Sequence, residues 1–131
     1  MQWLLDRKMV DEYARLLGDD NPLHMNADFA AQTVFRKPIA HGAILFGLIS
    51  RILGTSLPGP GTVYLSQTLR FRKPAYVGES VTVRVSLVEE LPDLEAILRT
   101  EVLRADGEIV AEGEARVKLP QWSRRPTKTT R

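Results

Sequence analysis

The most apolar segment of this chain runs from Pro38 to Leu53 and reads PIAHGAILFGLISRIL. After its proline, only one histidine, one serine and one arginine are clearly polar. A helix of about 15 residues spans roughly 22 Å, and a helix that is apolar on nearly every side belongs in the protein interior. The segment therefore predicts one long buried helix over residues 39–53, ended by Gly54 and a proline- and glycine-rich turn.

The sequence after this helix alternates between apolar and polar residues, which is the period of a half-buried strand. Four strands are predicted, over residues 63–72, 81–87, 94–103 and 109–119. Asp106-Gly107 predicts a tight hairpin between the last two. Long strands joined by short turns favour an antiparallel sheet. Packing the apolar helix on that sheet gives a single α+β domain.

Shorter elements are predicted before the long helix. Asp6 is a candidate N-cap and Gly18 a stop for a helix whose apolar face carries Met9, Val10, Tyr13, Leu16 and Leu17. The segment from Asp19 to His24 contains Asn21-Pro22, so we expect it to be neither regular helix nor central strand. Asn26 is expected to cap a short helix through about residue 32, and residues 2–5 allow only a short first strand.

Composition narrows the possible chemistry. The chain has 131 residues, the size of one domain. It has no cysteine, which excludes thiol catalysis and disulfides, and with only two histidines we expect no metal site. No stretch approaches the ~18 apolar residues of a membrane span. The start lacks a charged leader before its apolar residues, so the cytoplasm is the expected compartment.

The charge balance argues against nucleic acid as a partner. The formal net charge is +2, but residues 121–131 carry four basic residues and no acid, so residues 1–120 sum to 2 − 4 = −2. A nucleic-acid groove needs positive charge on the folded body. We therefore expect a domain over residues 1–120, followed by a basic, flexible tail over residues 121–131.

Asp19 and His24 are the first candidates for catalysis. A carboxylate and an imidazole five residues apart across a proline turn can converge on one point, and such a pair is a common solution for proton transfer at neutral pH. The alternative is that Asp19 caps a local turn and His24 is a structural histidine. Spacing alone does not decide between these interpretations.

His41 and Gly42 lie in the predicted first turn of the buried helix. Backbone N–H groups there have no intrahelical acceptor, and the helix dipole is positive. Gly42 has no side chain to keep a carbonyl oxygen from its N–H, as in an oxyanion hole. Equally, the glycine could only permit close packing of the helix on the sheet. Ser50 could hydrogen-bond a buried carboxylate, or bond back to its own helix.

A basic cluster follows, formed by Arg70, Arg72 and Lys73. These side chains could meet the phosphates of a nucleotide-bearing substrate. Most such clusters are only a solvated face, and composition does not distinguish the two roles.

Taken together, the sequence resembles a known family. Residues 18–24 (GDDNPLH) and 38–42 (PIAHG) are similar to the hydratase motif of the MaoC-like family, which includes (R)-specific enoyl-CoA hydratases with a hot-dog fold. Residues 61–67 (GTVYLSQ) and 71–79 (FRKPAYVGE) also resemble that family. The similarity covers roughly residues 8–120. The fold it implies, an antiparallel sheet wrapped around a long central helix, agrees with the pattern above.

The resemblance also implies roles for individual residues. Asp19 and His24 match the catalytic pair, and Gly42 matches the glycine whose N–H polarises the thioester carbonyl. Ser50 matches a serine that supports the aspartate, and Asn21 an asparagine that shapes the loop. His41 stands beside the glycine as a further supporting residue. Asp20 competes with Asp19 for the catalytic role, and Asp19 is preferred because it lies five residues before His24.

The implied activity is reversible hydration of a trans-2-enoyl thioester to the (R)-3-hydroxyacyl thioester, without metal or redox cofactor. The substrate would be an acyl-CoA or an acyl carrier protein thioester, bound by a homodimer. Two alternatives stay open at this point: a hot-dog acyl-CoA thioesterase and a non-catalytic acyl-thioester-binding module. Acyl-chain length and pathway are not readable from the sequence.

Overall fold

The computed structural model describes residues 1–120; the predicted basic tail, residues 121–131, lies outside them. The helices are α1 (Arg7–Leu17), α2 (Pro22–Met25), α3 (Ala27–Ala31) and α4 (Gly42–Thr55). The strands are β1 (Gln2–Leu4), β2 (Val63–Gln67), β3 (Arg70–Phe71), β4 (Ser80–Leu91), β5 (Glu95–Arg104) and β6 (Ile109–Lys118).

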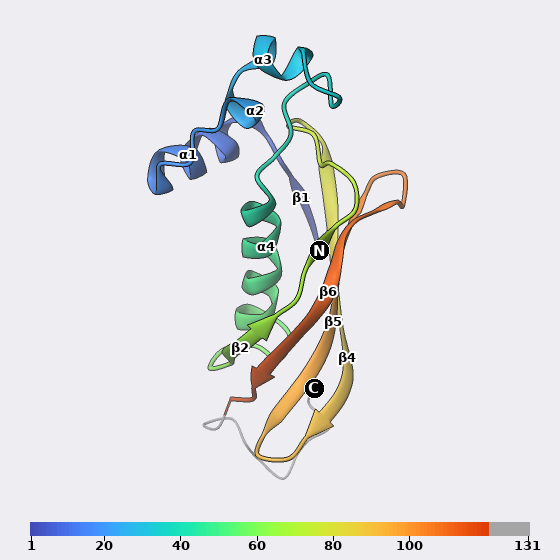
Figure 1. The fold of residues 1–131 in the computed structure, drawn as a ribbon. Coiled ribbons are helices and arrows are strands. Elements are labelled where there is room, and N and C mark those ends of the chain that lie inside the picture. The colour runs from blue at the N-terminus through green and yellow to red at the C-terminus, as the bar shows by residue number, and fades with distance from the viewer. Residues whose placement is uncertain (121–131) are drawn as a thin grey trace.

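The six strands form one antiparallel sheet that curls around α4. Its strand order is β1-β4-β5-β6-β2, and β3 pairs separately with β6. Figure 1 shows α4 lying along the sheet, with α1, α2 and α3 gathered near the N-terminal end of α4 and β2 near its other end. This arrangement is the α+β layered domain that the alternating pattern and the apolar helix predict.

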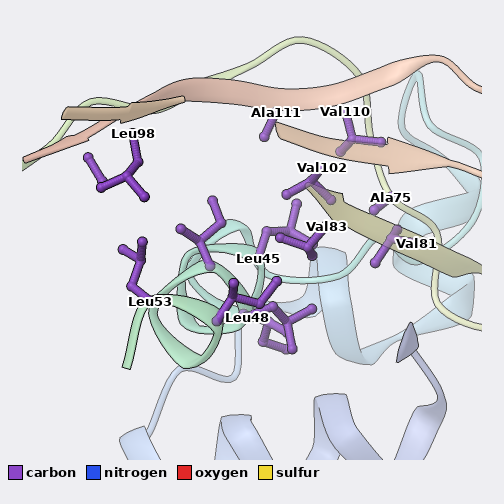
Figure 2. Packing of buried hydrophobic residues seen from close by; sticks show 14 of the residues in the cluster. Leu45, Leu48, Leu53, Ala75, Val81, Val83, Leu98, Val102, Val110 and Ala111 are labelled. Atoms are coloured by element: carbon purple, nitrogen blue, oxygen red, sulfur yellow. The ribbon is translucent and has the colours of Figure 1, made fainter. Parts of the chain in front are cut away.

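The core lies between α4 and the concave face of the sheet. Six residues of α4 are buried, namely Ile44, Leu45, Leu48, Ile49, Ile52 and Leu53. Figure 2 shows side chains of this helix pointing toward Val83, Leu98 and Val102 of the sheet. Burying one such side chain stabilises a fold by about 1.5–3 kcal/mol. The helix is therefore held rigidly, and its N-terminal end has a fixed position.

The predicted caps are present. The Asp6 side chain accepts a hydrogen bond from the Met9 N–H at 2.9 Å, and Gly18 ends α1 with φ at 73°. The Asn26 side chain accepts from the Phe29 N–H at 2.9 Å and caps α3. In the hairpin between β5 and β6, Gly107 adopts φ of 87°. These features were predicted correctly because each depends on a few neighbouring residues.

The apolar face expected for α1 was too wide. Val10 and Ala14 are its buried residues, whereas Leu16 and Leu17 are 78% and 63% exposed. These two leucines lie at the end of the helix, beyond the part whose side chains reach the core.

The long helix begins later than predicted, at Gly42 instead of Ile39. The three residues before it are held in extended form by the segment that leads into β4. The Ala40 N–H donates to the Ala75 oxygen at 2.7 Å, and the Val77 N–H donates to the Pro38 oxygen at 3.2 Å. Ile39 forms an isolated bridge with Tyr76. Tertiary pairing therefore overrides the helical periodicity of these residues.

The strand predicted over residues 63–72 is divided into β2 and β3. The chain bends between them, and at this bend it passes close to Gly113 of β6. A Cβ atom built on Gly113 would lie 1.8 Å from the Thr68 oxygen, so only glycine permits the approach. The Thr68 N–H donates to the Glu114 oxygen at 2.9 Å. The interruption depends on a residue over 40 positions away, which local periodicity cannot reveal.

A fourth correction concerns residues 19–24, where no helix was expected. The single turn α2 begins at Pro22, which fits the first helical position because its missing N–H would have no intrahelical acceptor there. The Asn21 side chain accepts from the Leu23 N–H at 3.0 Å and caps the turn. His24 is therefore carried by a short helix rather than an irregular loop.

Candidate active site

The N-terminal end of α4 is open. The three other helices of the described chain each have an Asp or Asn N-cap whose side chain accepts from the first turn. The N-cap of α4 is His41, and its side chain makes no such bond. Because the first N–H groups of a helix have no intrahelical acceptor, and the dipole there is positive, this end can receive a carbonyl oxygen.

Gly42, the first residue of α4, lies under an aromatic ring. A Cβ atom at this position would lie 2.8 Å from Cζ and 2.9 Å from Cε1 of Phe71. A side chain would therefore displace Phe71 or close the space above the Gly42 N–H. Because Phe71 belongs to β3, this contact is close packing of the helix end on the sheet, and the same missing side chain keeps the space above the Gly42 N–H clear.

His24 of α2 reaches the same region. Its Nδ1 lies 2.7 Å from the Ile39 carbonyl oxygen, which can only accept. The neutral ring therefore carries its proton on Nδ1, and Nε2 holds the free lone pair. Burial is the main cause that lowers the pKa of His24 below its usual 6.5. The hydrogen bond to the Ile39 oxygen and the charge of Asp19 raise this pKa, whereas the electrostatic interactions with His41 and Arg7 lower it further. His24 is therefore a neutral base at pH 7.

Asp19 follows α1 directly and is joined to His41. The His41 Nε2–H donates to the Asp19 carbonyl oxygen at 2.9 Å, and the Asp19 Oδ1 lies 4.0 Å from the same nitrogen. The rings of His24 and His41 are in contact, with centroids 4.0 Å apart. The side chain of Asp19 is 47% exposed, and its charge raises the pKa of His24. The Asp19 carboxylate and the His24 imidazole therefore both lie next to the buried ring of His41.

A cavity of about 450 Å³ lies between α2, the first turn of α4 and the segment after β3. His24 and Gly42 both line it, so the candidate base and the open helix end face one space. Its other walls are mostly apolar, and Arg72 and Lys73 stand on its lining. The remaining lining residues are Phe35, Ile39, Ala40, Leu45, Phe71, Pro74 and Ala75.

Five of the predicted site residues do not line this cavity, namely Asp19, Asn21, His41, Ser50 and Arg70. Asp19 is connected to it through His41, which adjoins both His24 and Gly42. Arg70 lies on the exposed strand β3 and does not line it. Ser50 lies half-buried on α4, more than two turns after Gly42, and within residues 1–120 its hydroxyl makes no hydrogen bond to Asp19. Support of Asp19 by Ser50 therefore stays a prediction.

The predicted pair of cations at the cavity is already paired with acids. Arg72 forms an ion pair with Glu112, and Lys73 pairs with Glu108 at 2.9 Å. Both Arg72 and Lys73 remain about half exposed. Exposed pairs of this kind contribute little to stability, typically about 0–1 kcal/mol, so a phosphate group can compete for either cation.

Sequence reasoning overlooked the two aromatic walls, Phe35 and Phe71. Phe35 follows α3 in a stretch without periodicity, and no pattern singled it out. Phe71 belongs to the short strand β3, and a signal was present, since it stands inside the basic cluster of Arg70, Arg72 and Lys73.

Residues 1–120 contain no group of three His, Asp or Glu side chains placed to hold a metal ion. Among the same residues no helix has the length and apolarity needed to cross a membrane.

The chain is similar to known proteins over most of its length. The model of the MaoC-like domain family matches residues 4–105. A 3-hydroxybutyryl-CoA dehydratase of Methylorubrum extorquens is 46% identical over 109 residues, which cover 83% of this chain and 69% of the relative. An (R)-specific enoyl-CoA hydratase of Aeromonas caviae is 45% identical over 114 residues, covering 85% and 84%.

The fold is also that of a solved relative. The structure of the (R)-hydratase from A. caviae involved in PHA biosynthesis superposes with a TM-score of 0.88 at 40% identity, over 92% of each chain. The predicted hot-dog architecture is confirmed by this match, and the family prediction by the extent of the sequence match. The chain belongs to the MaoC-like family.

Proposed function

We propose that this protein is an (R)-specific enoyl-CoA hydratase, which adds water reversibly to trans-2-enoyl-CoA and gives (R)-3-hydroxyacyl-CoA. One observation carries the proposal: a neutral His24 and the uncapped first turn of α4 line the same cavity, and Asp19 is bound to His41, the residue between them. Relatives over 40% identical are named as hydratases and dehydratases of this kind.

The chemistry follows from charge development. When the thioester carbonyl accepts a hydrogen bond from the Gly42 N–H, the positive helix end stabilises the enolate-like charge that forms as water attacks C3. The Nε2 lone pair of His24 accepts the proton of that water, and the Asp19 carboxylate orients its second O–H. The proton then passes to C2, so the C3–O and C2–H bonds form, the double bond is lost and the pair returns to its starting state.

Replacing either member of the pair tests this function. We expect Asp19→Asn and His24→Gln each to lower the turnover of crotonyl-CoA by about 10²-fold or more. Circular dichroism should stay unchanged because Asp19 is half exposed and His24 lies at the cavity wall. Asp20→Asn is the matched control, since this neighbouring carboxylate is exposed and makes no contact with His41. Wild-type turnover in either Asp19→Asn or His24→Gln would contradict the assignment.

The readout must also identify the reaction. The absorbance of the conjugated thioester should decrease as the substrate is hydrated. Chiral analysis of the product should then identify the (R)-3-hydroxy thioester. Release of free thiol instead would indicate the thioesterase alternative, and tight binding without turnover would indicate an acyl-thioester-binding module. A series of enoyl-CoA chain lengths then determines how much of the cavity the acyl group fills.

Arg72 and Lys73 are the proposed contacts for the phosphates of coenzyme A. They are cationic, half exposed and on the cavity lining, and their present partners are surface carboxylates. An acyl carrier protein thioester would present its phosphopantetheine group to the same opening of the cavity. Comparing the KM of crotonyl-CoA with that of crotonyl-pantetheine measures how much the nucleotide of coenzyme A contributes to substrate binding. No metal or redox cofactor is needed by the proposed steps.

A homodimer is the proposed assembly. The outer face of α4 and the strand β2 carry exposed apolar side chains, among them Phe46, Val63 and Leu65. Phe46 and Tyr64 are in ring contact, which places this part of α4 beside β2. A second copy of the chain would cover these side chains, and sedimentation equilibrium should give the mass of a dimer.

The cytoplasm stays the predicted compartment.

A further inference from the structure

His41 is the most buried polar residue near the cavity, and the hydration steps above do not use it. It is 2% exposed. Its ring lies between two others: its centroid is 4.7 Å from that of Tyr13 on α1 and 4.0 Å from that of His24 on α2. Three separate elements of the fold therefore meet at this one imidazole.

The two ring nitrogens of His41 have different surroundings. Nε2 donates to the Asp19 carbonyl oxygen at 2.9 Å, so the neutral ring has its proton there. Nδ1 is buried and has no hydrogen-bond partner within residues 1–120. An unsatisfied buried acceptor is unfavourable for stability. An apolar ring would fill the same space without that cost, so stability alone does not explain a histidine at this position.

The Nε2–H bond has a specific target. Asp19 lies between the end of α1 and the single turn α2, in a segment that exposes most of its residues. The segment is fastened to residues 39–41 at each of its ends. At one end His24 Nδ1 donates to the Ile39 oxygen at 2.7 Å, and at the other His41 donates to Asp19. Without the second bond, the main chain at Asp19 would be free of the rigid helix α4.

We infer that His41 is a positioning residue, whose Nε2–H holds the Asp19 main chain against the N-terminal end of α4 and so fixes the Asp19 carboxylate relative to His24 and Gly42. This inference rests on the proposed hydratase function. It assigns to His41 no proton transfer and no contact with substrate. A displacement of about 1 Å in a catalytic group can lower turnover by about 10²-fold, so the anchor has a kinetic consequence.

The test uses variants of His41 that separate the effect of losing its hydrogen-bond donor from the effect of losing its ring. His41→Phe keeps a ring in the stack and removes the donor. His41→Gln places an amide N–H near the position of Nε2, and His41→Met has a similar length without a donor. Thr55→Val is the matched control, because it removes a hydroxyl that donates at 2.7 Å to the Arg51 carbonyl at the opposite end of the same helix.

We expect His41→Phe and His41→Met to lower kcat by about 10- to 100-fold, with KM changed less than about threefold because the cavity wall is intact. The melting temperature should change little, since the exposed Asp19 can bond to water and the unpaired Nδ1 is removed. His41→Gln should recover most of the loss, and Thr55→Val should match the wild type. Wild-type kcat in His41→Phe, or equal loss in Gln and Met, overturns the inference.

Amide hydrogen exchange gives a readout that does not depend on activity. The His24 N–H, which donates to the Asn21 oxygen at 2.9 Å, reports the order of the segment. It should exchange faster in the Phe and Met variants and near the wild-type rate in Gln, while amides of β5 stay protected. If the wild type hydrates no enoyl thioester, the proposed function fails, and the exchange rates still decide the role of His41. Unchanged exchange of the His24 amide in the Phe and Met variants would overturn the positioning role of His41. If His41→Phe does not fold, the Gln and Met pair alone decides the question.

Discussion

The N-terminal ends of α1 and α4 differ in a way that separates stability from function. At α1 the Asp6 side chain accepts from the Met9 N–H, and the helix end is satisfied from within. At α4 the N-cap is a histidine whose side chain contributes nothing to the first turn. The more deeply buried helix therefore has the less satisfied end. This difference indicates that its open N–H groups are kept for a ligand.

Of the changes that test the difference between these two helix ends, blocking the open end of α4 should have the largest effect. Gly42→Ala places a Cβ 2.8 Å from the Phe71 ring, so either the ring moves into the cavity or the carbonyl site narrows. We expect kcat/KM for crotonyl-CoA to fall by about 10²-fold, the typical cost of losing one oxyanion-hole donor. Gly54→Ala is the control on the same helix, because its Cβ meets nothing within 4 Å. Equal activity in both variants would remove the functional reason for the open end.

A smaller effect is expected from acid. Burial is the main reason that the pKa of His24 lies below 6.5, so the acid limb of the kcat/KM profile should lie below pH 6.5, with kcat/KM falling about tenfold per pH unit beneath that pKa. The folded state binds its proton less readily than the unfolded chain. His24 therefore contributes stability that is present above pH 6.5 and lost as the pH falls through the folded pKa. An acid limb above pH 7 would contradict a neutral His24.

The smallest effect is expected at the satisfied helix end. Asp6→Ala removes the cap of α1 and should lower the free energy of unfolding by about 1 kcal/mol, measured by urea denaturation. Activity should be unchanged, because Asp6 makes its hydrogen bond to Met9 and does not line the cavity. If Asp6→Ala impaired turnover as strongly as Gly42→Ala, the two helix ends would not differ in role.

The sequence predicted the features that depend on neighbours along the chain. Asp6, Asn26 and Gly107 act within three residues, and each was placed correctly. The start of α4 was placed too early, because pairing of residues 38–40 with residues 75–77 has no local signature. The split of β2 from β3 was missed for the same reason.

The candidate site was predicted in part. Asp19, His24 and Gly42 were singled out from one motif, and the structure places all three around the N-terminal end of α4. The contact of His41 with Asp19 could not be predicted, since 22 residues separate them and spacing does not encode which nitrogen faces which oxygen. Arg70 was predicted as part of a basic cluster with Arg72 and Lys73, and it does not line the cavity.

Gly113 has an effect that extends beyond the bend where it lies. Any side chain on it would push Thr68 and Leu69 away from β6, since even a methyl group would overlap the Thr68 oxygen. Phe71 follows two residues later on the same edge, so the position of its ring over Gly42 depends on this close approach. The width of the cavity at Gly42 therefore depends on the absence of a side chain at Gly113, a residue of another strand.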